Sequence, residues 1–306
     1  MANQEPNIEQ QGKIKRIRQI AEKIIGLPTL PTVVAKMIEL VDNPKTSASS
    51  LSKLISTDQA LTAKILKLAN SAYYGFPREI TTVNLAIVVL GFNTVKDMGL
   101  SVSVLDAFPD MEDIEHFEMS SFWEHSIGVG VGAKMLARSF GYRVSGEAFV
   151  GGLLHDVGKL ILNQYLHSDF ISILKKAHKD RVDFREVEME VIGTTHSQVG
   201  AWLAEKWRLP RIIVDSISFH HNPELVENNP ELVLFTHLAD IICRRAGVGT
   251  SGSYDNPVIS PAAFEMIDKL KIPVTEDDLD SIQMDFLVEF EKAQSFIDFI
   301  HGHSRD

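Results

Sequence analysis

HDVGK, residues His155 to Lys159, is the stretch of this 306-residue chain that decides its fold and its chemistry. It places an imidazole beside a carboxylate at the end of an apolar segment, residues 148–154. Five more side chains of these two kinds lie around it: His125, His196, His220, His221 and Asp240. Such groups are ligands that suit iron, manganese, zinc or nickel. Seven are more than one ion needs and about what two adjacent ions take, so the sequence predicts a metal centre with two ions.

The set of seven is more informative than any of its members. They lie on about five successive predicted helices, several in apolar surroundings, and a protein core rarely tolerates so many unpaired polar groups. A shared cation is the simplest explanation. Lys159 follows Asp156 by three residues, on the same side of a helix, where an ammonium group suits an anionic oxygen such as phosphate. Asp156 and Lys159 are therefore the candidate catalytic residues.

Other polar residues receive plainer interpretations. The remaining lone histidines, His237 among them, are interpreted as surface residues or satisfied core residues, which is the commoner role of a single histidine. An acidic run is most often a solvated helix face. That interpretation applies to Glu186, Glu188 and Glu190.

Composition and charge exclude several classes of protein. The chain is 44% hydrophobic and 23% charged, which is too apolar for disorder. Its formal charge of −11 argues against general nucleic-acid binding, which needs basic surface. A single cysteine, Cys243, allows no internal disulfide and fits a reducing cytoplasm. No apolar run approaches the roughly 20 residues of a membrane helix, so we expect a cytoplasmic protein with no membrane contact.

Apolar residues recur at helical spacing along nearly the whole chain, and no stretch alternates as a half-buried strand does. The fold class is therefore predicted to be all-α. In the first half we expect a helix over 13–25, an N-cap at Asp58, another at Thr82 and a helix stop at Gly91. In the second half helices are expected over 117–140, 145–157, 168–179, 183–192, 194–207, 210–221 and 231–247.

The chain is long for one core, so two helical subdomains are expected. The acidic, turn-rich stretch 108–113 marks the boundary between them. The division is an extension helix over 1–26, a first subdomain over 27–112, a second, ligand-bearing subdomain over 113–250, and a loop with a helical tail over 251–306. Residues 248–260 are expected to be a flexible loop. The tail aromatics Phe286, Phe290, Phe296 and Phe299 either cover the core or form a dimer face.

Two blocks of sequence resemble the HD superfamily of metal-dependent phosphohydrolases, and more closely its HDOD branch. The first comprises residues 27–31 (LPTLP), 55–62 (ISTDQALT), 68–72 (LANSA) and 86–91. The second comprises HDVGK, residues 195–203 (THSQVGAWL), 207–210 (WRLP) and 219–224 (FHHNPE). The resemblance extends from about Leu27 to Ala246 and implies that the second subdomain is an HD-type helical bundle.

The resemblance also implies a role for each candidate ligand. His125 matches the first histidine of the superfamily, and His155 with Asp156 matches the doublet that names it, in which the aspartate bridges two metals. His196, His220 and His221 match later histidines of the related HD-GYP phosphodiesterases, and Asp240 matches the closing aspartate. The Gly-Tyr-Pro element of those enzymes is replaced here by Asn222-Pro223-Glu224-Leu225, which argues against cyclic di-GMP hydrolysis.

Many HDOD proteins are signalling or output modules without the metal ligands, whereas this sequence keeps them. The resemblance thus implies a bacterial signal-transduction output protein with a protein partner and a dinuclear centre, in which we favour iron over manganese, nickel or zinc. The alternative is a metal-dependent phosphohydrolase or phosphodiesterase acting on a nucleotide or cyclic nucleotide, a phosphate-containing small molecule. There, Lys159 would neutralise charge on the phosphoryl oxygens. A di-iron oxygenase is the third possible function.

Overall fold

The protein is all-α in the part of the chain that the structure describes. This computed structural model describes residues 17, 20, 22, 30–41, 45–108, 111–142, 145–294, 297 and 298. Within these ranges the only bridge of extended type is an isolated one between Ile114 and Phe117. The predicted fold class is confirmed. Most of the expected helix over 13–25 lies outside the described residues, as do Phe296 and Phe299.

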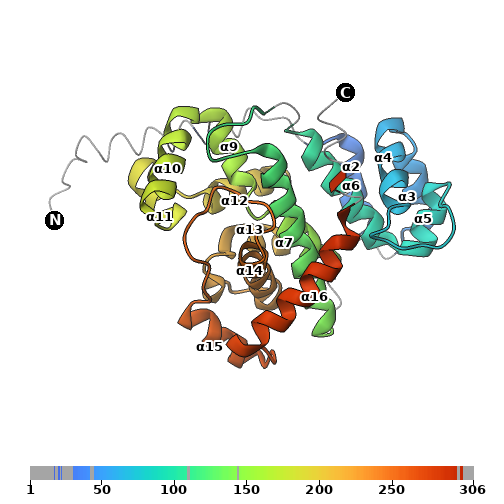
Figure 1. Ribbon diagram of the computed structural model, residues 1–306. Coiled ribbons are helices and arrows are strands. Elements are labelled where there is room, and N and C mark those ends of the chain that lie inside the picture. Colours follow the sequence, from blue (N-terminus) through green and yellow to red (C-terminus); the bar gives the residue numbers. More distant parts are fainter. Residues whose placement is uncertain are drawn as a thin grey trace, which may run out of the picture.

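The first helices form a layer of their own on the right of Figure 1. They are α2 (Thr32–Val41), α3 (Ala48–Ile55), α4 (Gln59–Ala69), α5 (Val83–Leu90) and α6 (Phe92–Asp106). The predicted caps are confirmed, because Asp58 accepts a hydrogen bond from Leu61 N at 3.0 Å and Thr82 accepts one from Leu85 N at 3.1 Å. Gly91 ends α5 with a φ of 92°, a backbone conformation that glycine adopts at little cost.

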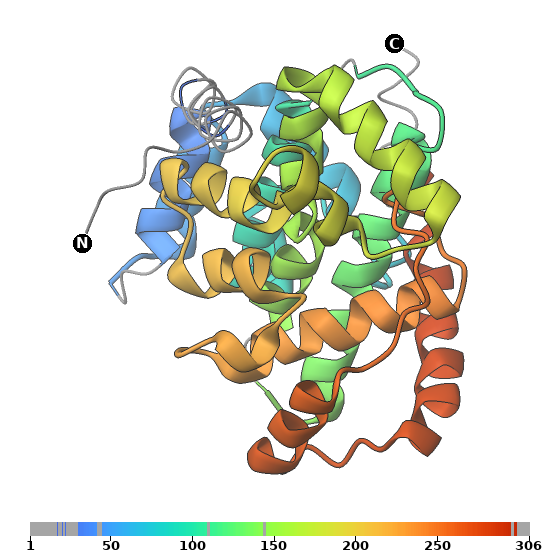
Figure 2. The same ribbon diagram turned by 90° about the vertical axis from the view of Figure 1, so that its left-hand side faces the viewer.

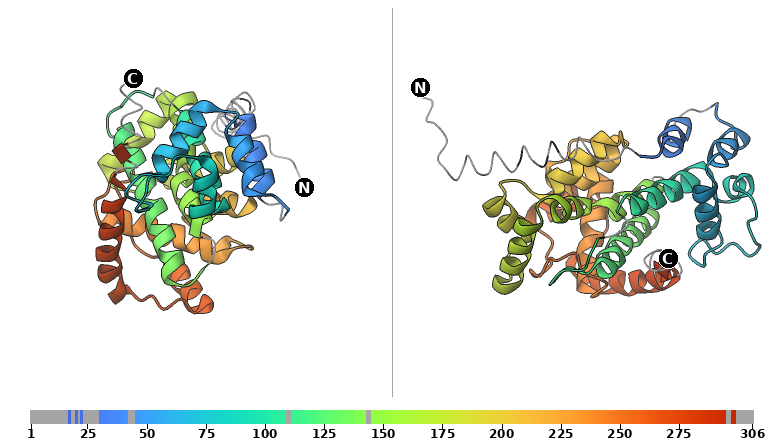
Figure 3. Two further views of the ribbon diagram at one scale, coloured as in Figure 1. Left: turned by 90° about the vertical axis from the view of Figure 1, so that its right-hand side faces the viewer. Right: turned by 90° about the horizontal axis from the view of Figure 1, so that it is seen from above.

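The remaining helices surround a long central helix, α7 (Met119–Ser139). Helices α8 (Ser145–Leu154) and α14 (Pro230–Arg245) pack along α7, and α8 also contacts α6 of the first layer. A connected group of three helices packs on α8: α9 (Val157–Tyr165), α12 (His196–Lys206) and α13 (Arg211–Phe219). At the end of the molecule far from the first layer lie α10 (His167–Asp180) and α11 (Phe184–Val191) (Figures 1 and 3).

The C-terminal helices cover the lower part of this assembly (Figure 2). After the short helix η1 (Pro223–Leu225) and α14, the chain continues into α15 (Pro261–Leu270), η2 (Glu276–Asp278) and α16 (Leu279–Lys292). Helix α16 packs on α7 and α14, and its Phe286 and Phe290 are buried there. These two aromatic side chains therefore cover the core, which is the first of the two roles expected for them, the other being a dimer face.

One helix of the sequence prediction is divided in the structure. The helix expected over 145–157 ends at Leu154, and a separate helix, α9, begins at Val157. Gly158, at the start of α9, lets this helix approach α12 closely, since a β-carbon there would lie 1.9 Å from the carbonyl oxygen of His196. His155 and Asp156 consequently stand in a turn between two helices.

The segment 248–258, which we call the strap, is the loop that was expected around these residues, but it is fastened to the core. Thr250 N donates to Ser121 O at 3.1 Å, and Ser251 is buried. Gly249 has a φ of 58° and lies so close to α7 that a β-carbon would stand 2.4 Å from the backbone of His125. A polar, glycine-rich composition indicated a loop correctly but gave no sign of this docking.

No helix in the described ranges combines the length and apolar character needed to cross a membrane.

Charged side chains are buried where α6 meets α8. Lys96 Nζ lies 4.0 Å from Asp97 Oδ1 and 3.6 Å from Glu147 Oε1. Neither carboxylate oxygen of Asp97 has a hydrogen-bond partner among the described residues. Burial raises the pKa of Asp97 to about 7, with the Lys96 ammonium opposing that rise.

We predict that Asp97→Asn stabilises the protein more at pH 8 than at pH 5. At pH values between the unfolded pKa near 4 and the folded pKa of about 7, the folded state binds more protons than the unfolded state. The free energy of unfolding therefore falls as the pH rises, by at most ~1.4 kcal/mol per pH unit. The Asp97→Asn variant does not lose this stability, because its side chain does not ionise. Urea unfolding at both pH values measures the free energy of unfolding, with the exposed Asp180→Asn as control. An Asp97→Asn effect independent of pH would contradict the prediction.

Candidate metal centre

The structure brings all seven predicted ligands together from five parts of the chain. His125 lies in the middle of α7, and His155 and Asp156 form the turn before α9. His196 is the first residue of α12, the pair His220 and His221 directly follows α13, and Asp240 lies in α14. Six of the seven are buried, and His221 is half-buried.

Asp156 belongs to two groups of donors at once. In the first group, ligand atoms of Asp156, His196, His220 and His221 lie within 4.8 Å of one another. In the second, those of His125, His155 and Asp156 do so. Asp156 presents Oδ1 to His196 Nε2 at 3.0 Å and Oδ2 to His155 Nε2 at 3.3 Å. Asp240 adjoins the second group, with Oδ1 3.2 Å from His125 Nε2.

Several of these converging atoms have no hydrogen-bond partner among the residues that the structure describes. They are Nε2 of His125, His155 and His220, and Oδ1 of Asp156. An unsatisfied buried polar atom is costly, and four in one place require a common partner. The donor set of imidazole nitrogens and carboxylate oxygens fits divalent transition metals. The described residues can therefore hold metal ions at this site.

The outer ring nitrogens fix the orientation of the imidazoles. His155 Nδ1 donates to Gly152 O at 2.6 Å, and His220 Nδ1 donates to Ile217 O at 2.9 Å. A carbonyl oxygen only accepts, so Nδ1 carries a proton in both rings, and Nε2 has a free lone pair whenever the ring is neutral. This is the tautomer that a metal ligand requires.

Glu188 is a site residue that the sequence interpretation missed. Its side chain is fully buried and accepts from both Nδ1 and the backbone N of His196, at 2.8 and 3.0 Å. The interpretation as a solvated face is wrong for Glu188, whereas Glu186 and Glu190 are exposed. The helical spacing could have identified Glu188. The apolar residues Phe184 and Val191 stand four residues before and three residues after it, on the face of α11 that turns toward the core.

Burial and neighbouring charge set the ionisation of the centre. Burial disfavours the Asp156 carboxylate, yet its pKa stays well below the usual range because His155, Lys159 and His196 surround it. Burial, together with the neighbouring His155 imidazole, holds the pKa of His220 well below its usual value. The site thus pairs an ionised carboxylate, Asp156, with a neutral imidazole, His220.

Lys159 connects Asp156 to the strap. Its Nζ is fully buried and donates to Asp156 Oδ2 at 2.9 Å, Ser251 Oγ at 3.0 Å and Ser253 Oγ at 3.2 Å. An ammonium group has three N–H donors, so all are engaged. The aromatic ring of Phe184 lies 4.8 Å from the same nitrogen.

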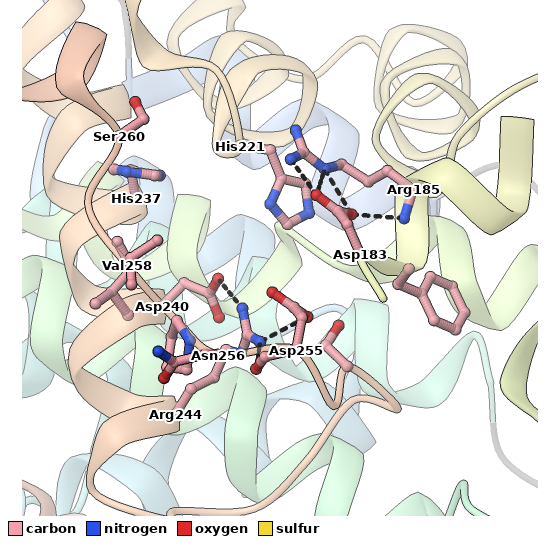
Figure 4. A pocket seen from close by; sticks show the side chains of 14 residues that line it. Asp183, Arg185, His221, His237, Asp240, Arg244, Asp255, Asn256, Val258 and Ser260 are labelled. Carbon is pink, nitrogen blue, oxygen red and sulfur yellow. Dashed lines mark hydrogen bonds and ion pairs between the residues drawn. The ribbon is translucent and has the colours of Figure 1, made fainter. Parts of the chain in front are cut away.

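A cavity of about 180 Å³ opens beside the centre (Figure 4). His221 and Asp240 belong to its wall. Arg185 pairs with Asp183 and donates to Asn222 Oδ1 at 2.8 Å, and Arg244 donates to Asp255 Oδ1 at 2.8 Å. Both arginines also line the cavity.

His237 lines the cavity from the α14 side and was not among the predicted site residues. It is buried, as a core histidine would be, and Nδ1 donates to His220 O at 2.7 Å. Its Nε2 has no partner among the described residues, so it is only half satisfied. Burial lowers the pKa of His237, which keeps the ring neutral. Its position three residues before Asp240, on the same helix face, was the available signal.

Comparisons with known proteins agree with this architecture. The crystal structure of an HDOD domain protein of unknown function from Geobacter sulfurreducens is 25% identical, with a TM-score of 0.73 over 95% of this chain and 98% of that one. A Shewanella amazonensis protein, named provisionally as a phosphohydrolase, is 24% identical, with a TM-score of 0.71 over 92% of this chain and 98% of that one.

A curated relative, an uncharacterized protein of Treponema pallidum, is 26% identical over 241 residues. That match covers 78% of this chain but only 46% of the relative, so this chain spans less than half of its length. The family model of the HDOD domain matches residues 27–223, well over half of the 306 residues. The chain belongs to the HDOD family.

Proposed function

We propose that this protein binds two divalent ions, bridged by Asp156, and uses them to hydrolyse a phosphoester. The observation that carries the proposal is the double role of Asp156, whose two carboxylate oxygens face different imidazole groups. One ion would be held by His125, His155, Asp156 and Asp240. The other would be held by Asp156, His196, His220 and His221. Iron is our first choice of metal, and manganese, nickel and zinc suit the same donors.

The domain division is part of the proposal. Every proposed ligand falls between residues 125 and 240, within the second subdomain predicted over 113–250. The first subdomain, 27–112, contributes no ligand and contacts this half through α6 and α8. The tail over 251–306 would then supply part of the strap above the centre and the helix that covers α7.

Each polar residue has a defined task in this proposal. Bound divalent ions supply Lewis acidity, which lowers the pKa of water and polarises a phosphate oxygen. Asp156 stays ionised and would be a ligand of both ions. Glu188 fixes the ring of His196, and Lys159 fixes Asp156, because its three donors are already engaged. Arg185 and Arg244 lie where they can approach the oxygens of a phosphoester in the cavity.

A signalling module with a structural or sensory metal centre is the second candidate. It is favoured by the burial of the centre beneath the strap, and by a cavity of about 180 Å³. Pockets for drug-sized ligands usually measure roughly 300–1,000 Å³. In this case the helical surface binds a protein partner, and the ions stabilise the fold or report metal supply.

Turnover by the metal-loaded protein separates the two candidates. We expect the protein reconstituted with Mn²⁺ or Fe²⁺ to release nitrophenol from p-nitrophenyl phosphate or its bis ester, and expect Asp156→Ala to lower the rate more than about 100-fold because both ions lose a ligand. Asp180→Ala, on the surface, serves as control. Metal binding without turnover on these esters or on cyclic dinucleotides would support the signalling candidate and contradict hydrolysis.

We further expect Glu188→Gln to weaken metal binding about 10- to 100-fold, since a neutral amide cannot accept from both His196 nitrogens as a carboxylate does. The exposed Glu186→Gln is the matched control on the same helix. Competition with a fluorescent chelator measures both affinities. Equal affinities of the two variants would show that Glu188 does not support the centre.

A further inference from the structure

Helix α16 has apolar side chains on its outer face as well as on the face that it buries. The inner face packs on α7 and α14, and its Phe286 and Phe290 are buried there. On the opposite side lie Met284, Leu287 and Val288, which are 64%, 37% and 56% exposed. A surface helix is usually apolar only where it meets the core, so the second apolar face of α16 is not explained by the fold.

The three exposed side chains form one continuous patch, which we call the α16 stripe. Leu287 follows Met284 by three residues and Val288 follows it by four, and residues at this spacing are neighbours on a helix surface. Single exposed apolar residues are common, whereas an apolar patch rimmed by polar residues marks an interaction site. In Figures 2 and 3 α16 lies at the edge of the molecule, where a partner can reach its outer face.

Carboxylates surround the α16 stripe at both ends and on one flank. They belong to the exposed residues Asp280, Asp285 and Glu291. By helical spacing, Asp280 and Glu291 lie one turn before and one turn after the stripe, and Asp285 lies beside it. None of the three forms an ion pair within the described ranges, and Lys292, the single basic residue of α16, is paired with Glu289. The rim of the stripe is therefore negatively charged.

This charge distinguishes between the occupants that an apolar helix face could have. A second copy of the chain would bring the same carboxylates against these, and like charges across an interface oppose association. The same repulsion disfavours an anionic membrane surface. A helix with apolar residues along one face and lysine or arginine beside them matches both the apolar centre and the acidic rim.

We propose that the α16 stripe is a docking site for a basic amphipathic helix of another protein. The apolar residues of that helix pack on the stripe, and its lysines or arginines pair with the carboxylates of the rim. The stretch from Asp280 to Glu291 is about 16 Å long, so about three turns of a partner helix cover it. This docking site goes beyond the proposed function, because none of its residues belongs to the metal centre, and the two proposals succeed or fail independently.

Two matched double variants distinguish the stripe from exposed apolar residues elsewhere. The test variant carries Met284→Gln and Val288→Gln, and the control variant carries Met189→Gln and Val88→Gln. Met189 and Val88 are 49% and 68% exposed and lie in helices α11 and α5. Glutamine has a good helix propensity, so both variants should keep their helices, which circular dichroism checks.

The probe is a fluorescein-labelled synthetic peptide of leucine and lysine, with the leucines spaced to form one face of a helix. A second peptide has glutamate in place of every lysine. Fluorescence anisotropy measures the affinity of each peptide for the full chain at low and high salt. A third variant neutralises the rim and carries Asp280→Asn, Asp285→Asn and Glu291→Gln.

We expect the basic peptide to bind the full chain and the acidic peptide not to bind. The test variant should bind the basic peptide at least about tenfold more weakly, because the buried centre of an interface carries most of its binding energy. The control variant should bind like the unmodified chain. Neutralising the rim should weaken binding and remove most of its dependence on salt.

Any of four results would overturn the proposal. They are no binding of the basic peptide, equal binding of the two peptides, the same loss of affinity in both double variants, or an unchanged salt dependence after the rim is neutralised. Analytical ultracentrifugation of the unmodified chain adds a check on the occupant. A dimer that is abolished in the test variant would identify a second copy as the occupant and contradict the basic helix.

Discussion

Burial of Asp156 among imidazoles is the constraint on which the rest of the site depends. A carboxylate in the protein interior is stable only when its charge is met by neighbours. His155, His196 and Lys159 all lie within 3.3 Å of its oxygens. Yet Oδ1 and three nearby imidazole nitrogens have no hydrogen-bond partner within the described part of the chain, and an unsatisfied buried polar atom costs roughly 1–3 kcal/mol. A pair of cations would satisfy these atoms together, which is why we propose a dinuclear centre.

The surrounding helices hold this arrangement through close backbone contacts. A β-carbon on Gly152 would lie 2.7 Å from the backbone of Gly130, so α8 and α7 approach each other at their glycines. Gly158 allows the same approach of α9 to α12. These contacts bring His125, the His155–Asp156 turn and His196 into one site. Because the three come from different helices, the precision of the centre depends on helix packing more than on any single loop.

The sequence predicted the fold class, and it singled out seven side chains that the structure brings together, because helical periodicity and residue chemistry both leave a pattern. Helical spacing is regular over most of the chain, and the caps at Asp58 and Thr82 follow from local hydrogen bonding alone. The convergence of His125 with Asp240, more than 100 residues apart, followed from the cost of burying unpaired polar groups and from the resemblance to the HD superfamily. The division at residues 112 and 113 stays a prediction.

Features that depend on tertiary contacts escaped the sequence. Glu188 was assigned to a solvated face because its acidic neighbours hid the apolar positions Phe184 and Val191. The strap was expected to be a flexible loop, whereas Lys159 donates hydrogen bonds to its Ser251 and Ser253 across a separation of more than 90 residues. The unpaired nitrogen of His237 depends on which ring atom meets His220, and no spacing rule specifies that.

The most direct test is to locate the ions in a crystal of the protein grown with Mn²⁺, by anomalous scattering at the manganese edge. The geometry predicts two peaks, one on each side of Asp156, the first near His125 and Asp240 and the second near His196 and His221. A single peak, or none within bonding distance of Asp156, would contradict a dinuclear centre bridged by this residue.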